Sequence, residues 1–153
     1  MLTGKVALVT GGGRGIGEAI AEAFSRAGAS LVLAARTRQE VETVAARLRQ
    51  ASSPAVAVAC DVADPQQVER LMVDTVTAFG PPDVLVNSAG VYGPIGHFAE
   101  TDLERWTEAI RINLLGTVYC TRTVLPGMIR RRSGKIINLS GGGAVGPFPR
   151  FSA

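Results

Sequence analysis

The chain has 153 residues with a formal net charge of +3, and 46% of its residues are hydrophobic and 19% charged. This length suits one domain with a buried core, and the hydrophobic content excludes an intrinsically disordered chain. No apolar run reaches the roughly 18 residues that a membrane-spanning helix needs, and the first residues lack a basic-then-apolar leader. We therefore expect a cytoplasmic protein of one domain that has no membrane partner.

The basic and cysteine residues do not indicate a nucleic-acid or metal site. The run Arg130-Arg131-Arg132 is too short for a nucleic-acid patch and suits the end of a helix, where cations meet the negative pole of the dipole. Cys60 and Cys120 lie far apart in apolar surroundings, with no cysteine or histidine at ligand spacing. We expect both as small core residues, and we predict no nucleic-acid partner, no disulfide framework and no metal.

Short β-branched runs alternate with longer helical patterns along the chain. Five runs predict strands, at residues 6–10, 31–35, 55–59, 84–87 and 136–139. Helical patterns cover residues 16–27, 40–49, 65–79 after an Asp64 cap, and a long stretch that Thr101 or Asp102 caps and that runs towards Leu125-Pro126. The alternation predicts βαβ units and therefore an α/β fold with a Rossmann-like, doubly wound parallel sheet.

A glycine-rich segment lies between the first predicted strand and the first predicted helix. A helix N-terminus offers unpaired N–H groups and a positive pole that suit a pyrophosphate, and glycines let the backbone approach it closely. No P-loop lysine follows, because Gly15 is succeeded by Ile16 and Gly17. The segment therefore predicts a dinucleotide site rather than a P-loop NTPase. The predicted contacts are Thr10, Gly11, Gly13, Arg14, Gly15, Ile16 and Gly17.

The glycine spacing resembles the TGxxxGxG fingerprint of the short-chain dehydrogenase/reductase family and differs from the shorter pattern of sugar-nucleotide epimerases. Asp61-Val62, after the third strand, resembles the family's adenine-binding step. The next strand ends in Asn-Ser-Ala-Gly, which resembles the family's NNAG motif with Ser88 in place of the second asparagine. The resemblance runs from residue 5 to the last residue, and it implies cofactor contacts at Asp61, Val62, Asn87, Ala89 and Gly90.

Two further segments resemble the family's catalytic positions. Asn113 lies in an Arg-Ile-Asn-Leu context that matches the catalytic-site asparagine, and Ser140 ends a run similar to the one before the catalytic serine. In the family's Asn-x-Ser-Ser pattern the second serine is the catalytic one, and here Gly141 stands at that place. The resemblance implies that Asn113 supports a proton-relay water and that Ser140 polarises a substrate carbonyl.

The residues at the end of the second strand predict which dinucleotide binds. NAD-binding proteins place an acid here, which holds the ribose 2′-OH. In this chain Ala35 stands at that position and is followed by Arg36 and Thr37. An arginine can hold a 2′-phosphate with two hydrogen bonds, and Arg14 in the glycine loop is similar to basic residues of NADP-preferring family members. The sequence thus favours NADP(H), with NAD(H) as the alternative.

The resemblance implies an oxidoreductase that moves hydride between NADP(H) and a ketone or alcohol substrate, similar to a 3-oxoacyl reductase. The family's proton donor is a tyrosine with a lysine four residues later, and neither Tyr92 nor Tyr119 has that lysine. We therefore expect residues 1–153 to form one dinucleotide-binding domain, truncated before the Tyr-x-x-x-Lys motif and its C-terminal strands and helices, and inactive by itself. The full-length protein is then a homo-oligomer, a dimer or tetramer. The alternative is a non-catalytic dinucleotide-binding or regulatory module.

Overall fold

The computed structural model describes every residue except 142, 144 and 147. Its strands are β1 (Val6–Thr10), β2 (Ser30–Ala35), β3 (Ala55–Ala59), β4 (Val84–Asn87) and β5 (Lys135–Asn138). Its α-helices are α1 (Gly15–Arg26), α2 (Arg38–Gln50), α3 (Pro65–Phe79), α4 (Leu103–Ile110) and α5 (Gly116–Arg131). A 3-10 turn, η1, covers Phe98–Glu100, and a π-helical segment, η2, covers Arg111–Leu115 and joins α4 to α5.

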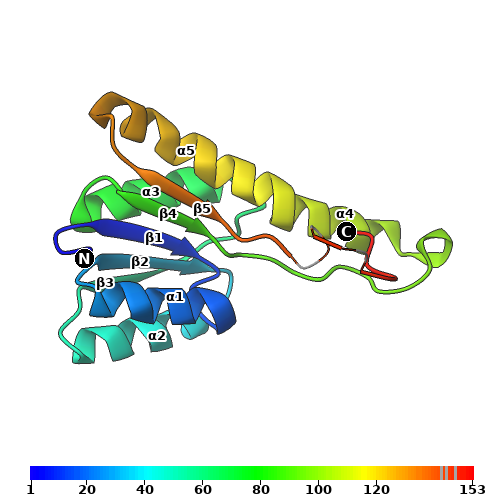
Figure 1. The fold of residues 1–153 in the computed structure, drawn as a ribbon, viewed down its shortest axis with the longest axis horizontal. Helices are drawn as coiled ribbons and strands as arrows, with labels where there is room; N and C mark the ends of the chain where they lie inside the picture. Colours follow the sequence, from blue (N-terminus) through cyan, green and yellow to red (C-terminus); the bar gives the residue numbers. More distant parts are fainter. Residues whose placement is uncertain (142, 144, 147) are drawn as a thin grey trace.

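The five strands form one parallel sheet in the order β3-β2-β1-β4-β5, between two layers of helices (Figure 1). Neighbouring side chains of β1 point to opposite faces, as strand geometry requires. Ala7 and Val9 pack with α1 and α2 in one core cluster, whereas Leu8 packs with α3 and α5 in the other. These observations confirm the α/β, Rossmann-like doubly wound sheet, and the bounds of β1, β3 and β4 are those that the sequence predicts.

The long helix after residue 101 agrees with the prediction at its start and differs from it at its end. Of the two predicted caps, Asp102 is the N-cap, since Asp102 Oδ1 accepts the backbone N–H groups of Glu104 and Arg105. The helix continues through Pro126 to Arg131, although proline removes one backbone donor from a helix. Pro126 lies on the exposed side of α5, while the buried stripe of Cys120, Val124 and Met128 runs past it. Core packing therefore outweighs the proline, and the predicted stop near Pro126 is wrong.

The arginine run and the two cysteines lie where the sequence predicts them. Arg130 and Arg131 lie in the last turn of α5, and Arg132 is its left-handed C-cap, so the arginine run does end a helix. Cys60 and Cys120 are both buried as free thiols. Across the described residues, no helix combines the length and the apolar character that a membrane crossing requires.

Candidate functional site

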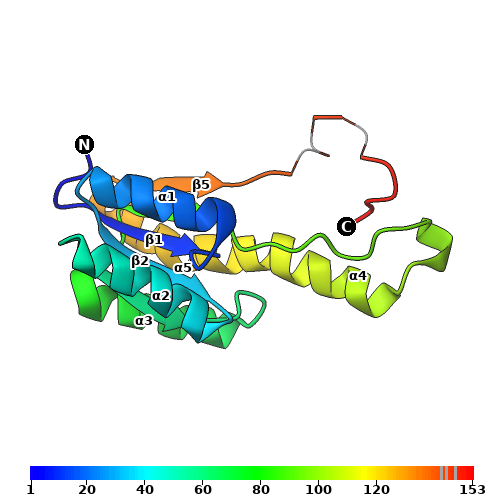
Figure 2. The ribbon, with the colours of Figure 1, turned by 90° about the horizontal axis from the view of Figure 1, so that it is seen from below.

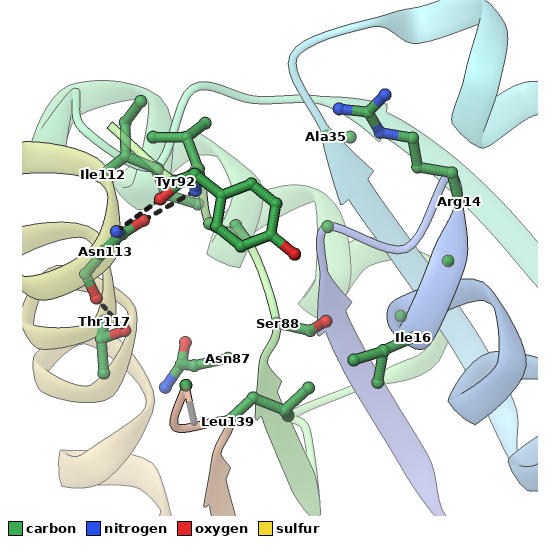
Figure 3. Close-up of a pocket in the computed structure, with 18 of the residues that line it drawn as sticks. Arg14, Ile16, Ala35, Asn87, Ser88, Tyr92, Ile112, Asn113, Thr117 and Leu139 are labelled. Carbon is green, nitrogen blue, oxygen red and sulfur yellow. Dashed lines mark hydrogen bonds between the residues drawn. The ribbon is translucent and has the colours of Figure 1, made fainter. Parts of the chain in front are cut away.

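A pocket of about 920 Å³ opens at the carboxyl ends of the strands (Figure 3). The sheet order reverses between β1 and β4, because the chain fills β2 and β3 on one side of β1 and then crosses to β4 on the other. In open α/β sheets, ligands bind in the crevice at such a switch point. The pocket is lined by loops that follow each of the five strands. The topology therefore brings segments that are far apart in the sequence to one site.

The glycine loop after β1 lines the pocket, and two of its glycines lie too close to other backbone atoms to carry a side chain. Gly11 has a φ of +66°, and a Cβ at this position would lie 2.8 Å from the backbone nitrogen of Ala89. A Cβ on Gly17 would collide with the carbonyl oxygen of Gly11. Arg14 is the N-cap of α1 and makes no side-chain capping hydrogen bond. The positive end of α1 is therefore free of an internal cap, as an anion site at a helix N-terminus requires.

Thr10 differs from the other predicted loop contacts because it does not line the pocket. Its side chain is only 1% exposed. Its Oγ1 accepts the N–H groups of Ser88 and Ala89 at 3.2 and 3.3 Å and donates to the carbonyl of Val86 at 3.4 Å. Thr10 thus fixes the loop after β4 against β1, and its direct contact with a cofactor stays a prediction. The other predicted residues of this loop, which are Gly11, Gly13, Arg14, Gly15, Ile16 and Gly17, all line the pocket.

The ends of β2 and β3 form the side of the pocket that carries the charged side chains. Ala35, Arg36 and Thr37 line it, as do Asp61 and Val62. Figure 3 shows the Arg14 side chain extending from the glycine loop in the direction of Ala35. Two arginines therefore border the position at which an acid would stand in an NAD site.

Two acidic residues accompany these arginines. Glu40, in the first turn of α2, also lines this side of the pocket, and the sequence analysis did not identify it. A Cβ on Gly13 would lie 2.9 Å from Glu40 Cβ, so the glycine loop packs directly on α2. Asp61 Oδ1 accepts the N–H of Ala63 at 2.9 Å, and its own N–H donates to Gln67 Oε1. Asp61 is thereby held in place by the turn that leads into α3.

Asn87, at the end of β4, joins the sheet to the pocket. Its Nδ2 donates to Asn138 Oδ1 at 2.8 Å and to Thr121 Oγ1 at 3.3 Å, which ties β4 to β5 and α5. The residue is only 5% exposed, and its Oδ1 has no hydrogen-bond partner among the described residues. A buried acceptor without a partner has a free-energy cost, so a water or ligand donor would be favoured beside it. Ser88, Ala89 and Gly90 follow it along the pocket wall.

Asn113 lies in the π-helical segment and is fully engaged by the loop after β4. Its Oδ1 accepts the N–H of Val91 and its Nδ2 donates to the carbonyl of Val91, both at 2.8 Å (Figure 3). Its own carbonyl accepts the Thr117 hydroxyl at 3.0 Å. π-Helical turns inside α-helices often occur at functional sites. Here the π-helical turn lies beside the pocket and carries a side chain that holds one of its walls.

Ser140 and Gly141 follow β5 and both line the pocket. Ser140 is exposed, so its hydroxyl is accessible from the pocket. The structure therefore brings both predicted catalytic residues, Asn113 and Ser140, to the same site as the glycine loop. Lys5 and Lys135 lie at the amino ends of β1 and β5, away from this edge of the sheet, and Lys5 pairs with Asp83 at 3.4 Å.

One wall of the pocket is aromatic, and the sequence analysis did not identify Phe148 and Phe151 as part of it. Tyr92, Phe148 and Phe151 line it, and residues 148–153 lie beside the loop that follows β4 (Figures 1 and 2). An isolated antiparallel bridge pairs Ile95 with Phe151, and Gly96 donates its N–H to the carbonyl of Arg150 at 3.0 Å. Neither segment has a periodic pattern, so no local signal predicts that they meet.

The two thiols do not form a reactive centre. Burial raises the pKa of Cys60 to about 11 and that of Cys120 to about 12. Both thiols are therefore protonated near neutral pH and are poor nucleophiles. Within the part of the chain that the structure describes, no group of three or more His, Cys, Asp or Glu side chains could hold a metal ion.

The sequence comparisons point to oxidoreductases. A family model described as short chain dehydrogenase matches residues 5–153. An uncharacterized oxidoreductase of Thermotoga maritima is 41% identical over 140 residues, which cover 92% of this chain and 54% of that protein. The chain spans about half the length of the curated relatives that it matches.

Solved structures share the fold and include complexes with two different cofactors. An NAD⁺-bound xylitol dehydrogenase matches 98% of this chain and 58% of its own, with a TM-score of 0.92 and 30% identity. A metagenomic short-chain oxidoreductase in complex with NADP matches 98% of this chain and 68% of its own, with a TM-score of 0.92 and 34% identity. A 3-ketoacyl-ACP reductase from Sinorhizobium meliloti 1021 matches 86% and 51%, with a TM-score of 0.83 and 37% identity. The family model accounts for all but the first four residues, and the chain belongs to the short chain dehydrogenase family.

Proposed function

We propose that the protein is an NADP(H)-dependent oxidoreductase that transfers hydride between the nicotinamide and a ketone or alcohol carbon. The observation that carries this proposal is one pocket that joins an uncapped helix N-terminus and two arginines to Asn113 and Ser140. A substrate similar to a 3-oxoacyl group, the kind that the name of the Sinorhizobium reductase describes, belongs to this class of ketones. We propose further that the protein acts as a homo-oligomer, a dimer or tetramer.

The residues that would hold the cofactor follow from the chemistry of each part of the pocket. The N–H groups of the glycine loop and the positive end of α1 suit the pyrophosphate. Arg14 and Arg36 suit a 2′-phosphate, since guanidinium groups bind phosphate oxygens in pairs. Asp61 and Val62 would hold the adenine, and Asn87, Ala89 and Gly90 would hold the ribose, since all five line the same pocket. Bound there, the cofactor would supply the hydride.

The chain's own residues then orient the substrate and handle its oxygen. The exposed Ser140 hydroxyl can donate a hydrogen bond to a substrate carbonyl and so polarise it. Asn113 holds the wall of the pocket through Val91 and supports the proton relay. No tyrosine among the 153 residues has a lysine four positions later, so we propose that residues 1–153 are a single cofactor-binding domain that does not complete proton transfer by itself.

The cofactor preference is tested by charge reversal at Arg36. Removing a charged hydrogen-bond partner of the 2′-phosphate costs about 1.5–3 kcal/mol, so Arg36→Asp should weaken NADPH binding about 10- to 100-fold. NADH, which lacks this phosphate, should bind the variant at least as well as before. Nicotinamide fluorescence titrations of both cofactors against the wild-type chain and the variant measure these dissociation constants.

Arg26→Asp is the matched control, because Arg26 is an exposed arginine in the last turn of α1, at the opposite end of that helix from the pocket. This variant has the same net charge as Arg36→Asp and should keep the wild-type preference. Unchanged NADPH selectivity in Arg36→Asp would contradict the assignment to NADP(H). Failure of both cofactors to bind the wild-type chain would contradict the dinucleotide site itself.

A further inference from the structure

The aromatic side chains are unevenly distributed over the molecule. The chain has five Phe, two Tyr and one Trp, and all but Phe24, Phe79 and Tyr119 lie in the loop after β4, in α4 or in residues 148–151. These segments gather at one end of the molecule, beyond the carboxyl ends of the strands (Figures 1 and 2). The aromatic surface is thus concentrated beside the pocket rather than in the core.

Three of these aromatic residues form a wall of the pocket. The Tyr92 and Phe151 rings meet edge to face with their centroids 5.8 Å apart, and the centroids of the Phe148 and Phe151 rings lie 4.4 Å apart. Tyr92 is nevertheless 76% exposed, and Phe148 is also exposed. Figure 3 shows the Tyr92 ring projecting into the space between Asn113 and Arg14. The wall therefore presents ring surface that no described residue of the chain covers.

Two hydrogen bonds to backbone carbonyls hold the segment that carries Phe148 and Phe151. Trp106 Nε1 donates to the carbonyl of Ser152 at 3.0 Å, which links α4 to the segment that carries Phe148 and Phe151. Gly96 and Arg150 join the same segment to the loop after β4. These contacts bring two loops together and position their rings on one side of the pocket. A pre-positioned apolar surface costs little entropy when a ligand binds to it.

The charged side chains of the pocket come from other segments than the aromatic wall. The charged side chains that line the pocket are Arg14, Arg36, Glu40 and Asp61, and they follow β1, β2 and β3 or begin α2. The described side chains that line the pocket after β4 and β5 are apolar or carry only neutral polar groups, such as the hydroxyls of Tyr92 and Ser140. Among the described residues that line the pocket on the side of Ser140, a phosphate or carboxylate of the substrate would therefore find no side-chain cation to pair with.

From these observations we infer that the substrate carries an uncharged aromatic ring next to its reacting carbonyl or alcohol carbon, and that Tyr92 and Phe148 select it. The inference rests on the proposed function, because it assigns the substrate side of the same pocket. Aromatic rings prefer edge-to-face and offset contacts with one another. A flat ring fits such contacts with the wall, whereas a saturated ring of similar size has no π-face to offer.

The test measures ligand binding to the NADP⁺-loaded chain by ligand-observed NMR, after NADP⁺ binding has been established in the same sample. The probes are acetophenone, its saturated analogue cyclohexyl methyl ketone, and the charged analogue 4-acetylbenzoate. An aromatic contact contributes about 0.5–1.5 kcal/mol beyond area burial, or roughly 2- to 12-fold in affinity. We expect acetophenone to bind about 3- to 10-fold tighter than the saturated ketone and tighter than the carboxylate.

The variants Tyr92→Leu and Phe148→Leu keep apolar volume but remove a ring, and each should reduce the preference for acetophenone to less than twofold. Phe98→Leu is the matched control, because Phe98 is an exposed ring that packs edge to face on Trp106 and does not line the pocket. Equal binding of the two ketones, a preference that survives in both leucine variants, or tighter binding of the carboxylate would overturn the inference. A chain that binds no NADP⁺ would instead contradict the proposed function.

Discussion

Asn113 uses both polar atoms of its side chain on one partner, the backbone of Val91. Both of its polar atoms bind the backbone of Val91 at 2.8 Å, and a Cβ on Gly90 would lie 3.2 Å from its Oδ1. The Asn113 side chain thus pairs with the N–H and carbonyl of Val91 as a neighbouring strand would, which the loop after β4 lacks. Asn113 therefore has a structural role as well as the proposed role in the proton relay, because Val91 and Ser140 line the same pocket.

Replacing Asn113 should therefore destabilise the protein. Asn113→Leu leaves the N–H and carbonyl of Val91 without partners, and each unsatisfied group costs about 1–3 kcal/mol when it is shielded from water. We expect a loss of about 2 kcal/mol in the free energy of unfolding, measured by urea denaturation. Thr117→Val is the control, since the Thr117 hydroxyl only adds a bond to a helical carbonyl. An Asn113→Leu loss no larger than that of Thr117→Val would show that Val91 does not depend on Asn113.

At the scale of elements, α3 begins with a cap that depends on charge. Asp64 Oδ1 accepts the N–H groups of Gln66 and Gln67 at 2.9 and 3.2 Å, and its Oδ2 accepts Gln67 Nε2 at 2.9 Å. These hydrogen bonds lower the pKa of the Asp64 carboxyl below its ordinary value of 3.8, and the bond from the Gln67 side chain has the largest effect. The carboxylate form is therefore favoured in the folded state more than in the unfolded chain.

This lowered pKa predicts an acid-dependent part of the stability. A carboxyl whose pKa is lower in the folded state stabilises the protein above its unfolded pKa, and the contribution is lost as the pH falls from about 4 through the folded pKa. Asp64→Asn should lose less stability than the wild-type protein between pH 5 and pH 3, in urea denaturation at each pH. Asp74→Asn, which changes an exposed residue of the same helix, should keep the wild-type acid dependence. Parallel pH profiles for the wild-type protein and Asp64→Asn would contradict the role of this cap.

The elements also show which parts of the structure a sequence can predict. β1, β3 and β4 are short apolar runs between turn residues, and α3 has an aspartate cap followed by proline, so local chemistry alone determines their ends. Pro126 misled the prediction, because its local cost is offset by tertiary packing of α5. At the site, the glycine loop is continuous in sequence and was predictable. The aromatic wall was not, because Tyr92 and Phe151 meet only through the fold.

At the scale of the whole molecule, apolar surface remains uncovered on the η2–α5 helix and on β5. Leu114, Val118, Leu125 and Ile129 are exposed large hydrophobic residues, and their spacing places them on one face of the η2–α5 helix. β5 is the outermost strand next to β4, and Ile137 on it is also exposed. Uncovered apolar helix faces and free strand edges promote association. The same face would suit the contact between subunits in the proposed homo-oligomer.

We therefore predict that the isolated 153-residue chain is only marginally stable and associates in solution. Size-exclusion chromatography with light scattering should show species heavier than the 16.0 kDa monomer, increasing with concentration. The double variant Val118→Lys with Ile129→Lys should shift the chain towards monomer, because two buried charges in a contact are costly. Val73→Lys on α3 is the control: Val73 is 64% exposed and Ile129 is 65% exposed, but Val73 lies on a different helix. A monodisperse monomer with a cooperative thermal transition would contradict the prediction, and association that Val73→Lys relieves equally would move the contact away from α5.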